Sequence, residues 1–169
     1  EMAFSALLAG LQGQPTRPRQ VVVVEVSTGR EIQRLRAHRD GVRNLFFSHG
    51  GKMLVSTNRS GQVRVEEIET GSLIFNELTG AKPNAVAFSK NHDWICVSGP
   101  DQMSLFTFPQ GKLVLKIPEG GQASFHPTLN SVMAINTGTS AALVDLSQGD
   151  RLRIVSLFEA LPSDYYQTV

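Results

Sequence analysis

Short apolar stretches alternate with clusters of turn-forming residues along the whole chain, and this alternation recurs with a period of roughly 40 residues. Short strands that end in phenylalanine are expected at Phe47, Phe88 and Phe125. A glycine that follows a strand recurs at Gly29, Gly71, Gly111 and Gly149. The apolar stretches are rich in Val, Ile, Leu and Phe, and Gly, Asn, Ser and Asp separate them, which is typical of strands joined by tight turns. The pattern therefore predicts one small antiparallel sheet per repeat.

A radial array of such sheets is a β-propeller, so we expect an all-β propeller segment of about four blades, each a four-stranded antiparallel sheet. The expected units are blade 1 (about 1–36, without its inner strand), blade 2 (about 37–78), blade 3 (about 79–117) and blade 4 (about 118–157). Residues 158–169 would begin a next blade or supply a closing strand. We expect a stretch of a longer propeller, and the alternative is a four-bladed ring closed by the C-terminal strand.

Composition describes a folded domain that is large enough to bury a core. The 169 residues are 41% hydrophobic and 18% charged, and the net charge of +1 gives no overall attraction to nucleic acid or to a membrane surface. The single Cys96 excludes an internal disulfide and favours a reducing compartment, so we expect an intracellular and cytoplasmic protein. No apolar run has the length of a membrane span.

The turns after the inner strands carry a recognisable pattern. Its copies are Phe47-Ser48-His49-Gly50-Gly51, Phe88-Ser89-Lys90-Asn91-His92 and Phe125-His126-Pro127, and Ala37-His38 stands before the second repeat. This pattern resembles the WD-repeat family, whose unit has Gly-His, a Phe-Ser-Pro-Asp-Gly turn and a closing Trp-Asp. The acidic end position is held by Glu25, Glu67 and Asp145, with Thr107 in the third repeat, and the Trp position by Val24, Glu66, Phe106 and Val144. The resemblance covers nearly the whole chain, but no repeat ends in Trp-Asp.

The resemblance implies a hydrogen-bonded set of His, Ser, Asp and Trp inside each sheet. His38 and Ser56 supply two members, but Ser60 replaces the Asp and Glu66 replaces the Trp, so a complete set is not expected. We expect β-branched packing to supply the rigidity instead, most clearly at Val21–Val24. Glu66 is expected to meet Arg64, which lies two residues away on the same strand face.

No catalytic, metal or cofactor site is predicted. His49, His92 and His126 belong to different sheets, which places them too far apart to bind one metal ion. Cys96, in the middle of an apolar strand, is expected to be an inert core thiol, and Trp94 a packing residue. Gly50-Gly51 and Gly120-Gly121 each lead into a strand, whereas a phosphate-binding loop leads into a helix. The expected protein is therefore not an enzyme.

Arginine is the charge feature that suggests a binding site. Seven arginines lie between residues 17 and 43: Arg17, Arg19, Arg30, Arg34, Arg36, Arg39 and Arg43. In a four-stranded blade, the loop between the second and third strands opens on the same rim as the connection between blades. We therefore predict that Arg17, Arg19, Arg39 and Arg59 lie together and bind an acidic or phosphorylated segment of a partner protein. An ordinary solvated surface is the alternative. Nucleic acid is disfavoured because Lys is scarce and no aromatic residues lie among the arginines.

The WD-repeat resemblance implies a non-enzymatic protein–protein interaction scaffold within a larger protein or a multi-subunit assembly. Two alternatives stay open: a regulatory or sensor propeller attached to an enzyme, such as a nucleotide-dependent switch, and an RNA-associated scaffold subunit. In the first alternative the chemistry would lie outside these residues.

Overall fold

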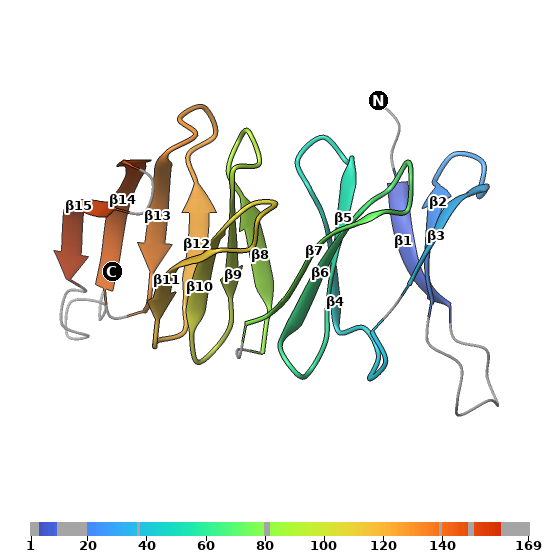
Figure 1. The fold of residues 1–169 in the computed structure, drawn as a ribbon, viewed down its shortest axis with the longest axis horizontal. Coiled ribbons are helices and arrows are strands. Elements are labelled where there is room, and N and C mark those ends of the chain that lie inside the picture. Colours follow the sequence, from blue (N-terminus) through green and yellow to red (C-terminus); the bar gives the residue numbers. More distant parts are fainter. Residues whose placement is uncertain are drawn as a thin grey trace, which may run out of the picture.

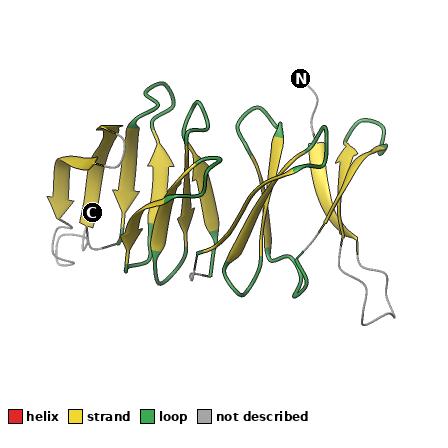
Figure 2. Cartoon of the chain, in the orientation of Figure 1, coloured by secondary structure: helices red, strands yellow, loops and turns green. Residues whose placement is uncertain are grey.

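The computed structural model describes residues 4–9, 20–36, 38–79, 82–138, 140–148 and 151–159. These residues form strands and connecting loops only, and none of them lies in a helix (Figure 2). In this described part, no helix is long and apolar enough to cross a membrane. The strands form four separate antiparallel sheets, which stand side by side in a row that follows the chain (Figure 1). The prediction of an all-β propeller segment of about four sheets is confirmed.

Each sheet is a simple meander, in which neighbouring strands follow one another in the sequence. The first contains β1 (Phe4–Ala9), β2 (Gln20–Glu25) and β3 (Glu31–Arg36). The second contains β4 (Asn44–Phe47), β5 (Met53–Thr57), β6 (Gln62–Glu67) and β7 (Leu73–Leu78). The third contains β8 (Ala85–Phe88), β9 (Trp94–Ser98), β10 (Met103–Thr107) and β11 (Leu113–Ile117). The fourth contains β12 (Gln122–Phe125), β13 (Val132–Asn136), β14 (Ser140–Gln148) and β15 (Arg151–Glu159). β14 runs on to Gln148, which pairs with Arg151 of β15.

The sheets pack face to face, and this explains the apolar runs in the sequence. Every residue of β5 and of β9 is buried, because a neighbouring sheet covers each face of these two strands. The outer strand β7 instead mixes exposed and buried residues. The Val, Ile and Leu runs therefore mark the second strand of a sheet, where side chains on both faces enter a core.

A separate hydrophobic core fills each space between neighbouring sheets. Val21 and Val23 of the first sheet pack with Leu54 of the second. Between the second and third sheets, Phe75 meets Phe106 edge to face, with 5.7 Å between ring centroids. The core between the third and fourth sheets contains Trp94, Cys96, Met103, Leu105, Met133, Ile135, Val144 and Leu146. The expected packing roles of Trp94 and Cys96 agree with this burial.

Loops gather at the two ends of the sheets. We call one end the connection rim: it contains the β5–β6 turn (58–61), the β9–β10 turn (99–102) and the connections 38–43, 79–84 and 118–121 between sheets, with residues 80–81 outside the described part. We call the other end the turn rim: it contains the turns after β4, β8 and β12 and the turns before β3, β7 and β11. The connection rim lies along the lower edge of Figure 1.

Candidate interaction rim

A hydrogen-bonded clamp joins two loops of the connection rim. Asp40, in the connection from the first sheet to the second, accepts hydrogen bonds from the Ser60 hydroxyl and from Nδ2 of Asn58, the latter at 2.6 Å. Asn58 also accepts the backbone N–H of Gln62 at 2.8 Å. The hydrogen bond from Ser60 is the main reason that the pKa of Asp40 is lowered. The clamp fixes the connection 38–43 against the β5–β6 turn.

Two of the four predicted arginines flank this clamp. Arg39 precedes Asp40 and Arg59 precedes Ser60, and both side chains are exposed. Neither forms an ion pair or a side-chain hydrogen bond within residues 4–9, 20–36, 38–79, 82–138, 140–148 and 151–159. Arg17 and Arg19 lie outside the described residues. The geometry thus brings Arg39 and Arg59 to the same rim, beside loops that are held together.

The buried ring of His38 is hydrogen-bonded to Gln62, a residue that also bonds to Asn58 of the clamp. His38 Nδ1 lies 3.0 Å from Oε1 of Gln62, and His38 Nε2 lies 3.0 Å from the Ser56 hydroxyl. Gln62 in turn donates to Asn76 on β7 at 2.9 Å. Because the amide oxygen of Gln62 only accepts, Nδ1 carries the ring proton and Nε2 accepts from Ser56. The expected His38–Ser56 pair is present, and Gln62 rather than Ser60 completes the ring's hydrogen bonding.

Glu66, at the family's tryptophan position, forms a buried ion pair. Its Oε1 lies 3.1 Å from Nη2 of Arg64, with side-chain exposures of 4% for Glu66 and 16% for Arg64. The expected contact on one strand face is therefore confirmed. Nε of Arg64 is buried and has no hydrogen-bond partner among the residues that the structure describes. The two opposite charges lie together in the interior, so the pair adds no net charge to the connection rim.

The acidic end positions of the repeats have a structural role on the opposite rim. Glu25 accepts a hydrogen bond from the Thr28 hydroxyl, and Glu67 accepts one from the Thr70 hydroxyl at 2.6 Å. Each threonine hydroxyl also accepts a backbone N–H two residues further on. These side chains satisfy polar groups of the turns before β3 and β7, so the acidic position stabilises a turn.

The three turn histidines are placed as the sequence suggested, in different sheets. The His92 ring packs on Phe88 with 5.4 Å between centroids, and burial together with nearby His49 lowers its pKa. His126 Nδ1 accepts backbone N–H groups of its own turn. Within the described residues, no group of three or more His, Cys, Asp or Glu side chains could hold a metal ion.

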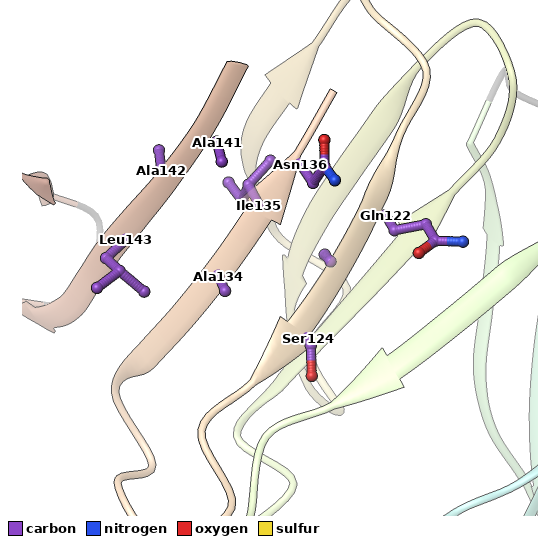
Figure 3. A pocket seen from close by; sticks show the side chains of 9 residues that line it. Gln122, Ser124, Ala134, Ile135, Asn136, Ala141, Ala142 and Leu143 are labelled. Carbon is purple, nitrogen blue, oxygen red and sulfur yellow. The ribbon is translucent and has the colours of Figure 1, made fainter. Parts of the chain in front are cut away.

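Cys96 and one face of the fourth sheet lie outside the loops of the connection rim. Cys96 is 3% exposed, and burial raises the pKa of its thiol to about 12, which keeps it neutral. A shallow hollow of about 380 Å³ lies along β12, β13 and β14 (Figure 3). Its lining contains no ionisable side chain: Gln122, Ala123, Ser124, Ala134, Ile135, Asn136, Ala141, Ala142 and Leu143.

Four stacked meander sheets define a repeat protein of the propeller class. Comparison with known families gives a match to the WD domain, G-beta repeat, at residues 29–65, which runs from the turn before β3 into β6. Residues 29–65 therefore match a WD repeat, which agrees with the resemblance expected from the sequence.

Two kinds of curated relative are similar to it. Centriole proteome protein 16 of Chlamydomonas reinhardtii is 37% identical over 98 residues, which is 55% of this chain and 5% of that protein. Small ribosomal subunit protein RACK1 of Trypanosoma brucei brucei is 24% identical over 100 residues, 59% of this chain and 31% of that protein, and the protein from Trypanosoma brucei rhodesiense gives the same figures. The chain thus spans no more than about a third of the length of these relatives. The repeats and these similarities support a protein-interaction scaffold in general terms.

Proposed function

We propose that this chain is a non-enzymatic protein-interaction scaffold whose connection rim binds an acidic or phosphorylated segment of a partner. Arg39 and Arg59, with Arg17 and Arg19 of the same predicted set, would contact the segment. One observation carries the proposal: Arg39 and Arg59 are exposed, each directly precedes one partner of the Asp40–Ser60 hydrogen bond, and neither forms an ion pair with the part of the chain that the structure describes. A planar guanidinium binds carboxylate or phosphate through paired hydrogen bonds, which suits such a segment.

Asp40, the acidic residue next to Arg39, does not cancel the charge of the two arginines in this proposal. Asp40 accepts hydrogen bonds from Ser60 and Asn58, so its carboxylate is engaged within the rim. Among the described residues, Asp40 forms no ion pair with Arg39 or Arg59. The bonded loops also hold the arginine backbones in place, so that binding orders only the long side chains.

The relatives support a role inside a multi-subunit assembly. One relative is named as a protein of the centriole proteome, and another as a protein of the small ribosomal subunit. Both names describe assemblies within the cell, which supports the proposal of an intracellular scaffold. The name of the second relative also favours an RNA-associated scaffold as the second candidate. Binding to RNA would depend steeply on salt, because it releases counterions from phosphates.

The test measures binding of a fluorescent oligo-glutamate peptide to the 169-residue chain and to a charge-reversed variant, Arg39→Glu with Arg59→Glu. We expect the variant to bind about tenfold more weakly, because it loses two charge contacts and gains two repulsions. Its melting temperature should stay close to that of the unchanged chain, since exposed substitutions cost little stability.

The matched control is Lys90→Glu with Lys116→Glu, two exposed lysines that lie outside the connection rim. This control changes net charge equally and should bind the peptide almost as well as the unchanged chain. Equal losses in both variants would overturn the rim proposal. Tight binding of a single-stranded RNA oligonucleotide with a steep salt dependence would favour the second candidate.

A further inference from the structure

Beyond the clamp, the connection rim carries a second pair of exposed cations. Asn44, at the start of β4, donates from Nδ2 to the carbonyl oxygen of Pro83 at 2.7 Å. Arg43 precedes Asn44 and Lys82 precedes Pro83, and both are exposed. The hydrogen bond therefore brings Arg43 and Lys82 to neighbouring positions. Together with Arg39 and Arg59 they make the rim of the second sheet basic.

The next part of the same rim has the opposite charge. Gly120, in the connection from the third sheet to the fourth, lies so close to the β9–β10 turn that an added Cβ would be 1.7 Å from the Pro100 carbonyl oxygen. Asp101 follows Pro100 and Glu119 precedes Gly120, and both carboxylates are exposed. No basic residue lies in 99–102 or 118–121. The rim of the third sheet is therefore acidic.

Hydrogen bonds tie the basic and acidic parts together. The backbone N–H of Thr79 donates to the Gly61 carbonyl oxygen at 2.9 Å, beside the clamp. Nε2 of Gln102 donates to the Thr79 carbonyl oxygen, and Gln102 adjoins Asp101. A path of three residues thus runs from the β5–β6 turn to the β9–β10 turn. The two charged parts are held at a fixed spacing.

We propose that the connection rim is a bipolar docking surface that selects a partner segment with an acidic block beside a basic block. This inference rests on the proposed function and adds the charge pattern of the partner. The acidic block would contact Arg39, Arg43, Arg59 and Lys82, and the basic block would contact Asp101 and Glu119. A segment that is acidic throughout would meet like charge at the third sheet, which disfavours it.

The test compares two peptides of equal length on the 169-residue chain at low salt. One carries glutamates followed by lysines, and the other carries the same glutamates followed by glutamines. We expect the bipolar peptide to bind about three- to tenfold more tightly, since two exposed ion pairs each contribute modestly and are screened by salt. A third peptide, with the same glutamates and lysines in alternation, should bind no better than the acidic one.

The decisive variant is Asp101→Lys with Glu119→Lys, which should reverse the preference so that the acidic peptide binds more tightly than the bipolar one. Its matched control is Glu69→Lys with Asp93→Lys on the turn rim, both exposed, which should keep the original preference. Equal binding of the bipolar and acidic peptides, unchanged by Asp101→Lys with Glu119→Lys, would overturn this inference and leave the proposed function standing. Failure of the acidic peptide to bind at all would count against the proposed function itself.

Discussion

Gln62 and His38 meet through a hydrogen bond of 3.0 Å between the amide oxygen of the glutamine and Nδ1 of the ring. His38 belongs to the connection between the first two sheets, whereas Gln62 begins β6 on the far side of the β5–β6 turn. Because Ser56 occupies the other ring nitrogen, both polar atoms of this buried ring are satisfied. The pair therefore anchors the connection to the second sheet.

Replacing Gln62 by leucine should destabilise the fold. Gln62→Leu leaves Nδ1 of His38 buried without a partner, which we expect to cost about 1–3 kcal/mol of unfolding free energy. Urea unfolding followed by circular dichroism measures the change. Gln122→Leu, at an exposed position of β12, is the control and should leave the midpoint nearly unchanged. Equal midpoints for Gln62→Leu and the unchanged chain would contradict the anchoring role.

Gly120→Ala should destabilise the chain more than Gly138→Ala does. An alanine at position 120 would collide with the backbone carbonyl of Pro100, which cannot turn aside as a flexible side chain can. We expect a loss of at least about 2 kcal/mol. Gly138 has a φ of +87° with no atom within 4 Å of an added Cβ, so alanine there should cost only the backbone strain, about 1–2 kcal/mol. Thermal unfolding of both variants decides the order, and the reverse order would refute the close approach.

The clamp should respond to acid. Ionised Asp40 accepts hydrogen bonds from Ser60 and Asn58, and these lower its pKa below the ordinary value of 3.8. A group with a lowered folded pKa contributes stability above its unfolded pKa and loses it as pH falls through the folded pKa. The clamp should therefore hold at neutral pH and weaken only below about pH 3.8.

Removing the Ser60 hydroxyl tests this assignment. Ser60→Ala should raise the pKa of Asp40 toward 3.8, which carboxyl NMR titration can follow. Asp145 is the internal control, because its lowered pKa comes mainly from the backbone N–H of Ser147, which donates at 2.8 Å. A titration of Asp40 that does not move in Ser60→Ala would show that the hydroxyl is not the cause.

The thiol of Cys96 should be inert while the chain is folded. Burial raises its pKa to about 12, so the nucleophilic thiolate is almost absent near neutral pH. At about pH 8 a thiol reagent should label the protein only after denaturant is added, since an ordinary thiol has a pKa of about 8.5. Rapid labelling of the native chain would mean that β9 opens readily to solvent.

The repeat period was enough to predict the architecture. Alternating apolar stretches and turn glycines reflect constraints that every sheet shares, and Gly71 and Gly111 do lie in the turns between consecutive strands. The contact between Arg64 and Glu66 was also predictable, because residues two apart on a strand share a face.

The rim was only partly predictable, because its key contacts depend on how loops of different sheets approach. Gln62 follows a turn glycine and looks like an ordinary strand start, so its bond to His38 depends on the connection folding back. Asp101 and Glu119 are isolated charges in the sequence. They come to one part of the rim because Gly120, next to Glu119, approaches Pro100, next to Asp101. The glycine pair at 120–121, which leads into a strand, was the one signal of close backbone contact.

Hydrogen bonds link Gly61 to Thr79 and Thr79 to Gln102, and they join the basic part of the connection rim to its acidic part. Since mainly backbone atoms fix the distance between the two charged parts, the conformational entropy lost on association falls on side chains and on the incoming peptide. Exchanging an exposed charge should then alter the dissociation rate without remodelling the scaffold. The same framework could serve different ligands after a few surface substitutions.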